Sequence, residues 1–377
     1  MSRAYLYAAM LAALVLAVPL ASGATSDLPP APTIDSAPPN PSATGTATLS
    51  FSDADPLATF QCQLDAGAFA PCTSPATYSG LGEGSHTFGV KAVDVLLNES
   101  DVVSYTWSVD TTPPPAPSIT AQPSNPSNDS SPTFKFGDTE GGVTFQCELD
   151  SGGFAACASP VAYAGQGDGS HAFTVQATDA AGNASSTSYA WTIDTVAPTV
   201  TLGTKPPSLS NDATPTFAFN ADEATPAGFE CKLDSAAFSP CTSPTTLGST
   251  PDGSHTFTVR AADAAGNVGS TSYAWTIDTV APTVTLGTTP PNLSNDPTPG
   301  FSFTANEAIP GGFECKLDGG TFAACTSPAT LGSTSDGSHT FIVRGTDTAG
   351  NTGQASYTWT IDTVAPTTTL TAKPANP

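Results

Sequence analysis

Apolar and polar residues alternate in short runs along the chain. Around Trp275, four such runs each place their apolar side chains on one face: Phe217 and Phe219; Phe229, Cys231 and Leu233; Phe257 and Val259; Tyr273, Trp275 and Ile277. Because successive side chains of a strand point to opposite faces, a period of two predicts half-buried antiparallel strands. Pro, Gly, Asn and Asp separate the runs, as they do in turns between strands.

The same pattern recurs along the chain. The tryptophans stand 84 residues apart, at Trp107, Trp191, Trp275 and Trp359. Each follows a cysteine pair with a spacing of ten residues, and a histidine lies fourteen residues after each pair. This is tandem duplication, and about seven short strands in roughly 84 residues fit a two-layer β-sandwich. We therefore predict an all-β fold of tandem antiparallel β-sandwiches.

The phrase after each tryptophan marks a boundary between repeats: DTTPPPAP after Trp107 and DTVAP after the other three. Proline fixes φ and removes a backbone donor, so a sheet cannot run on through it, and these linkers are expected to be short and stiff. Residues 365–377 match the start of a fifth unit, so we expect a truncated piece of a longer, elongated array. The predicted complete repeats are residues 31–110, 116–194, 197–278 and 281–362.

Three phrases carry a resemblance to a known family: FxCxLDxxxFxxC, DGSHTFTVxAxDAAGN and SYxWTIDTxAP. They resemble the bacterial immunoglobulin-like (Ig-like) repeats that occur in tandem in exported and cell-surface proteins, and the resemblance covers all four units. It implies an Ig-like sandwich and a role in adhesion, spacing or display. The cysteines depart from the antibody pattern, in which the disulfide joins two sheets from positions far apart in the sequence.

The N-terminus has the features of a secretory signal peptide, which we predict as residues 1–24. Arg3 precedes an apolar run from Ala8 to Leu20, and small residues suited to a signal peptidase follow. An uncleaved anchor is the alternative for this segment. After it, no apolar stretch approaches the roughly 20 residues needed to cross a bilayer, so we expect a chain that is secreted or held at the extracellular cell surface.

The negative charge of the mature chain limits the classes of partner that it can bind. Without the signal peptide, eight Lys and Arg stand against 33 Asp and Glu. A polyanion repels nucleic acid and anionic lipid, so neither is expected as a partner. We expect a monomeric array whose ligand is an unidentified protein or glycan on a surface.

The cysteines are predicted to form local disulfides, because an exported chain with evenly spaced cysteine pairs is typical of a disulfide framework. A hairpin centred at Ala236 would make Cys231 and Cys241 direct cross-strand neighbours, within the Cα range of a disulfide. Zinc binding by these cysteines with His255 and Asp252 is one alternative, although C-x9-C-x13-H lacks the short bite of structural zinc sites. Free or redox thiols are another, without a C-x-x-C motif to support them. The predicted pairs are Cys62–Cys72, Cys147–Cys157, Cys231–Cys241 and Cys315–Cys325.

A hydrolase triad of Ser254 and His255 with Asp252 or Asp263 is not expected. Neighbouring residues of a strand point to opposite faces, so Ser254 and His255 cannot meet locally. We predict no enzymatic activity for this segment. Asp263 begins the phrase DAAGN, which is typical of a turn whose glycine takes a positive φ. The first repeat reads DVLLN there, with Leu97 in the glycine position.

The aspartates before the linkers are weak calcium candidates, because ions at the junctions of modules can stiffen an array. They are Asp110, Asp194, Asp278 and Asp362. Calcium takes six to eight oxygens, and each junction offers one fixed carboxylate together with backbone carbonyls and whatever neighbours reach in. Solvated acids and turn caps are the alternative interpretation, and no other cofactor is expected.

These features predict a non-catalytic exported or cell-surface stalk, structural or adhesive. The alternative is a set of accessory glycan- or protein-binding modules of a larger extracellular enzyme, whose catalytic domain lies outside residues 1–377. Binding would need an exposed aromatic platform. Its candidates, at the hairpin ends, are Phe69, Phe154, Phe238 and Phe322.

Overall fold

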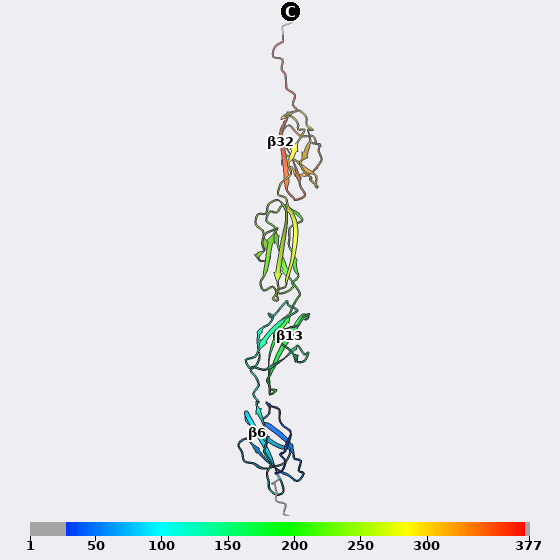
Figure 1. Ribbon diagram of the computed structural model, residues 1–377. Helices are drawn as coiled ribbons and strands as arrows, with labels where there is room; N and C mark the ends of the chain where they lie inside the picture. Colours follow the sequence, from blue (N-terminus) through cyan, green and yellow to red (C-terminus); the bar gives the residue numbers. More distant parts are fainter. Residues whose placement is uncertain (1–27, 374–377) are drawn as a thin grey trace, which may run out of the picture. The chain divides into compact units, whose positions relative to one another are not determined.

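The computed structural model describes residues 28–373, and the regular elements in that range are all β-strands. Figure 1 shows them, with β6 (Gly84–Val93), β13 (Gly169–Thr178) and β32 (Thr352–Ile361) in three different repeats. The all-β prediction is confirmed. No helix within residues 28–373 is long and apolar enough to cross a membrane. The predicted signal peptide lies outside the described residues.

The chain divides into two compact units. One takes in the residues up to 123 together with 132–163 and 171–190, and the other takes in 124–131, 164–170 and the chain from 191 onward. The division passes through the second repeat, so the repeat boundaries drawn from the sequence stay a prediction.

Repeats 1 and 2 have seven strands each, in one three-stranded and one four-stranded antiparallel sheet. The sheet orders are β1-β2-β5 and β4-β3-β6-β7 in repeat 1, and β12-β9-β8 and β11-β10-β13-β14 in repeat 2. The other strands are β1 (Thr33–Ser36), β2 (Thr46–Ser52), β3 (Thr59–Leu64), β4 (Ala70–Cys72), β5 (Ala76–Ser79), β7 (Val103–Val109), β8 (Ser118–Ala121), β9 (Thr133–Gly137), β10 (Thr144–Leu149), β11 (Ala155–Ala156), β12 (Val161–Ala162) and β14 (Ala184–Ile193).

Repeats 3 and 4 have nine strands each, two more than predicted. In repeat 3 the chain changes partner at Ala218: β17 (Thr216–Phe217) pairs with β21 (Thr245–Thr246), and β18 (Phe219–Ala221) pairs with β15 (Val200–Leu202). One predicted strand is therefore two. A short parallel strand, β16 (Leu209–Ser210), adds the other at the edge of the large sheet.

The large sheets of repeats 3 and 4 are five-stranded, in the orders β16-β23-β22-β19-β20 and β25-β32-β31-β28-β29. Two two-stranded sheets form the other layer of each of these repeats: β15-β18 and β17-β21 in repeat 3, and β24-β27 and β26-β30 in repeat 4. The other strands are β19 (Phe229–Leu233), β20 (Ser239–Cys241), β22 (Gly253–Ala262), β23 (Val268–Ile277), β24 (Val284–Leu286), β25 (Leu293–Ser294), β26 (Gly300–Phe301), β27 (Phe303–Ala305), β28 (Phe313–Leu317), β29 (Ala323–Cys325), β30 (Ala329–Thr330) and β31 (Gly337–Thr346).

The core of each repeat lies between its sheets, where the residues of predicted inward parity meet. In repeat 3, Phe217 and Phe257 are fully buried and stack with ring centroids 4.2 Å apart, and Trp275 lies 5.2 Å from Phe217. Fully burying one such side chain contributes about 1.5–3 kcal/mol, so these rings carry much of the stability of the sandwich. The same stacking recurs at Phe134–Phe173 and Phe301–Phe341.

Candidate functional site

A disulfide hairpin closes one edge of the large sheet in each repeat. In repeat 3, β19 and β20 pair antiparallel, and Cys231 and Cys241 are bonded with their Cα atoms 5.8 Å apart. The other predicted pairs are bonded in the same way, and residues 28–373 contain no free cysteine. Because both sulfur atoms are in a disulfide, neither is available as a zinc ligand or a redox thiol.

The predicted register of this hairpin is wrong. Cys231 lies opposite Ser239 rather than opposite Cys241, so the disulfide spans a diagonal. The hairpin turns one residue earlier than expected because Asp234 takes a positive φ of 52°, and the N–H of Ala236 donates to the carbonyl oxygen of Leu233. Aspartate enters this left-handed region more readily than most residues, and an aspartate occupies this position in every repeat.

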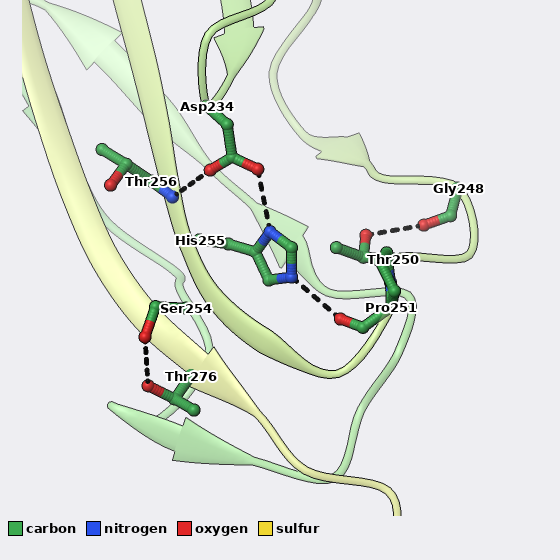
Figure 2. Close-up of polar contacts among 8 residues, drawn as sticks. All are labelled: Asp234, Gly248, Thr250, Pro251, Ser254, His255, Thr256 and Thr276. Carbon is green, nitrogen blue, oxygen red and sulfur yellow. Dashed lines mark hydrogen bonds and ion pairs between the residues drawn. The ribbon is translucent and has the colours of Figure 1, made fainter.

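His255, at the start of β22, joins the hairpin turn to the loop before its own strand. Its Nδ1 lies 2.9 Å from Oδ2 of Asp234, and its Nε2 lies 2.8 Å from the carbonyl oxygen of Pro251, as Figure 2 shows. Oδ1 of Asp234 accepts a hydrogen bond from the N–H of Thr256 at 2.7 Å. The imidazole is 9% exposed and packs near Trp275. We call Asp234, His255 and the Pro251 carbonyl the histidine clamp.

The clamp recurs in the other repeats. His86 and His339 each contact an aspartate and a backbone carbonyl, and His171 contacts Asp150. The aspartate stands 21 residues before the histidine in all four. The sequence therefore held a constant spacing from which this contact could have been predicted.

The clamp favours the charged form of its histidine. A carboxylate and a backbone carbonyl can only accept, so two N–H groups are needed to satisfy both, and only the imidazolium has two. The hydrogen bonds to Asp234 and to Pro251 accordingly raise the pKa of His255. The hydrogen bond from His255 lowers the pKa of Asp234. Each shift favours the charged form of its group.

No catalytic triad forms around His255. Ser254 points to the other side of the strand, where its Oγ lies 3.4 Å from Oγ1 of Thr276 (Figure 2). Asp252 bonds to the linker that follows the repeat instead of the imidazole. The side chains that would have to meet for hydrolysis are thus directed to three different partners.

The linker after repeat 3 is held at two consecutive residues. Oδ1 of Asp252 accepts hydrogen bonds from N and Oγ1 of Thr279, at 3.1 and 2.8 Å. One residue earlier, the carbonyl oxygen of Asp278 accepts a hydrogen bond at 2.7 Å from Nδ2 of Asn351, which belongs to repeat 4. We call the second contact the asparagine clasp. It recurs as Asn183–Asp110 and Asn267–Asp194.

The clasp depends on the predicted turn, which here reads DTAGN. Oδ1 of Asp347 accepts from the N–H groups of Gly350 and Asn351, and Gly350 has a φ of 101°. Oδ2 of Asp347 accepts from Nδ2 of Asn351, so the asparagine side chain is oriented before its other hydrogen reaches the linker. The turn chemistry predicted from the sequence thus also serves the junction.

Two of the four calcium candidates lie in groups of three carboxylates. The groups are Asp194 with Glu223 and Asp263, and Asp278 with Glu307 and Asp347. In each group, one oxygen per residue lies within 4.8 Å of the others. Within residues 28–373, Asp110 and Asp362 have no such group.

In the first group, the pKa values of Glu223 and Asp263 are shifted in opposite directions. Burial and the negative charges of Asp194 and Asp263 raise the pKa of Glu223. Burial opposes ionisation of Asp263 as well, but hydrogen bonds from Asn267 and its turn outweigh it and lower the pKa of that carboxyl. The group could supply three of the six to eight oxygens that calcium takes, and backbone carbonyls and water would have to complete the site. Sequence reasoning missed Glu223, which lies in a loop without a motif.

Three of the four aromatic candidates for a binding platform are half-buried, and one is exposed. In repeat 3, Phe238 is half-buried beneath Arg260, whose guanidinium carbon lies 4.0 Å from the ring centroid, and Lys232 lies 5.0 Å from it. Phe322 and Phe69 are also half-buried under cationic side chains. In repeat 2, Phe154 is 42% exposed, since Gln and Glu take the places of the arginine and the lysine.

No protein-family model matches the chain. Exoglucanase B of Cellulomonas fimi is 32% identical to it over 204 residues, 49% of this chain, and chitinase A1 of Niallia circulans is 35% identical over 129 residues, 31% of this chain. Each match covers 18% of the relative, so the chain spans about a fifth of the length of these relatives. The matched parts are their fibronectin III-like accessory modules.

The all-β sandwiches and the match to these accessory modules identify the class of domain. This chain is a tandem array of bacterial Ig-like, fibronectin III-like domains. Among solved structures, the array is similar to a four-repeat segment from the extending region of a large adhesion protein, with 20% identity, 88% of this chain and 99% of that one covered, and a TM-score of 0.32. It is similar to fibronectin III-like modules of Clostridium thermocellum CbhA, with 21% identity, coverages of 43% and 94%, and a TM-score of 0.32.

Proposed function

We propose that this Ig-like array is a non-catalytic, exported or cell-surface stalk, structural or adhesive, that spaces another part of its protein from a surface. The observation that carries the proposal is the double hold on the linker, by Asp252 from the preceding repeat and by Asn351 from the following one. A chain whose repeats had only to be tethered would need neither contact. Repeats joined in this way suit a spacer.

An extracellular location supports this function. Disulfides persist in oxidising compartments, and every repeat carries one. Closing a loop of about ten residues stabilises the fold by about 3 kcal/mol in the chain-entropy model, a large part of the stability of a small domain. The curated relatives, an exoglucanase and a chitinase, are secreted enzymes.

Small-angle X-ray scattering of the exported chain tests the stalk. Strands of eight to ten residues at about 3.3 Å per residue, together with the turns and linkers between them, predict a maximum dimension on the order of 120–160 Å for four repeats end to end. Replacing Asn183, Asn267 and Asn351 by Ala should shorten the mean dimension and leave the β-sheet circular dichroism unchanged.

The matched control is Asn98→Ala. Asn98 makes the same bonds within its own turn, to Asp94, but it belongs to the first repeat and has no linker bond among those described. Its replacement should leave the scattering unchanged. A wild-type chain much shorter than the predicted range, or a triple variant that scatters like the wild type, would contradict the proposal.

Accessory binding is the second candidate, and the likeness to modules of an exoglucanase and a chitinase favours it. On this alternative the array would bind a glycan next to a catalytic domain elsewhere in its protein. Phe154 is the exposed ring that a glycan could stack on. Sedimentation with insoluble cellulose and chitin tests it: a stalk stays in the supernatant, whereas retention that is lost in Phe154→Ala would favour the accessory function.

A further inference from the structure

The histidine clamp and the hold on the linker meet in one short loop. Nε2 of His255 contacts the carbonyl oxygen of Pro251, and the next residue, Asp252, accepts the two hydrogen bonds from Thr279. The position of the Asp252 carboxylate therefore depends on the same few backbone bonds that the imidazole fixes.

The same adjacency occurs in two other repeats. In repeat 1 His86 contacts the carbonyl of Gly82, and the next residue, Glu83, accepts hydrogen bonds from Thr111. In repeat 4 His339 contacts the carbonyl of Ser335, and Asp336 accepts hydrogen bonds from Thr363. The residue in the Pro251 position differs each time, but the histidine, the acid and the linker threonine are kept.

The imidazole cannot hold both of its partners after it loses a proton. The carboxylate of Asp234 is the stronger acceptor, so the remaining hydrogen stays on Nδ1. Nε2 then presents a lone pair to the carbonyl oxygen of Pro251, and two acceptors face each other at a contact that was 2.8 Å long. The loop that carries Asp252 loses its anchor, while the hairpin turn keeps its own.

We propose that each of these histidines is a proton-dependent latch for the linker that follows its repeat. The imidazolium of His255 fixes Pro251 and Asp252 so that the carboxylate grips Thr279, and the neutral ring releases them. Asp234 is the charged group that acts on the ring from another element among the described residues. Trp275, on β23, faces the ring with an uncharged indole. The latch concerns the junction alone and does not depend on what the array carries or binds.

The direction of the pH dependence follows from the clamp. The pKa of His255 is raised in the folded chain, so the latch is fully closed below the ordinary histidine pKa of about 6.5 and opens as the pH rises through the raised value. The pKa of Asp234 is lowered, so this carboxylate stays ionised throughout that range. The grip of Asp252 on Thr279 should thus hold in mildly acidic surroundings and be lost in alkaline ones, while the asparagine clasp stays in place.

Amide hydrogen exchange of the full chain, read by mass spectrometry between about pH 5.5 and pH 8.5, tests the latch. The linkers 278–282 and 362–366 both read DTVAP, and the second keeps its own histidine, His339, in a His255 variant, so it is the internal reference at each pH. In His255→Gln, linker 278–282 should exchange about tenfold faster than in the wild type at the acidic end. That difference should vanish at the alkaline end, and linker 362–366 should be unaffected.

Two further variants separate the latch from simple destabilisation. Asp252→Ala removes the grip but not the clamp, so it should speed exchange of linker 278–282 at every pH while β22 and β23 stay protected. Ser254→Ala, on the opposite side of the strand, should change neither. Unchanged linker exchange in His255→Gln would overturn the proposal. Faster exchange throughout repeat 3 would overturn it too, because the histidine would then stabilise the fold and not the linker.

Discussion

Gly353 offers a direct test of how tightly a linker is seated. It lies on β32 against the carbonyl group of Pro282, and a Cβ added there would overlap the carbonyl oxygen and lie 2.8 Å from the carbonyl carbon. Real Cβ atoms essentially never come within 3.0 Å of another heavy atom, and backbone cannot rotate away as a side chain can. Gly353→Ala must therefore push the linker off the strand or bend the strand.

Overpacking of this kind costs about 1–3 kcal/mol. We expect the cost of Gly353→Ala at the upper end of this range, because the added Cβ belongs to a strand and meets the backbone carbonyl of Pro282. For a domain of about 84 residues each kcal/mol lowers the melting temperature by roughly 4–8 °C. Differential scanning calorimetry of the full chain should thus show one component, repeat 4, shifted down by about 10 °C or more.

The control for this substitution is Gly332→Ala. Gly332 is in repeat 4 too, has no neighbour within 4 Å of an added Cβ, and does not take a positive φ. Its replacement should leave the melting temperature unchanged or slightly higher. If Gly353→Ala melts like Gly332→Ala, the linker is not seated on β32 and the reasoning fails.

Three more outcomes are expected. Replacing Cys231 and Cys241 together by Ser should cost repeat 3 about 3 kcal/mol in urea unfolding, and a loss below about 1 kcal/mol would mean that the hairpin needs no staple. Asp234→Asn should bring the pKa of His255 down towards its ordinary value in an NMR titration. It should also remove the stability that the clamp gives below about pH 6.5 and that the wild type loses as the pH rises through the raised pKa; an unchanged midpoint would contradict the clamp. Glu223→Gln should raise the melting temperature near pH 7 without calcium, because it removes a repelled carboxylate whose raised pKa marks it as destabilising above its ordinary range. A loss seen only when calcium is added would instead identify Glu223 as a cation ligand.

Periodicity was enough to predict the class of fold and the core, although not the two additional strands of repeats 3 and 4. Strand parity placed Phe217, Phe257 and Trp275 in the core, and all three are buried there. His255 shares the parity of Phe257 and is buried as well. These predictions hold because the alternation along a strand determines, over a few residues, which side chains share its buried face.

Contacts set by backbone detail could not be predicted in the same way. The cysteine spacing predicted a disulfide but not its diagonal register, because the register depends on the left-handed φ of Asp234. Glu223 joins Asp194 and Asp263 from a loop whose length, and not its sequence motif, decides where the side chain lies. The elongated form of the array stays a prediction from strand length and linker composition.

The first repeat explains why the turn was recognised and the clasp was not. There Leu97 takes the glycine position with a φ of 70° and is 81% exposed, a conformation that costs a leucine about 1–2 kcal/mol. Asp94 and Asn98 nevertheless make the same bonds as in the other repeats. The turn therefore forms without the glycine, and its residues fit turn chemistry in every repeat.

The clasp uses the hydrogen of the asparagine side chain that the turn does not need. One hydrogen of the asparagine Nδ2 satisfies the turn aspartate, and the other reaches the carbonyl of Asp110, Asp194 or Asp278. Since the bond to the turn aspartate alone explains the motif, the sequence carries no separate sign of the bond to the linker. The contacts that would make these sandwiches a stalk thus use hydrogen-bonding groups of residues that the turns already require.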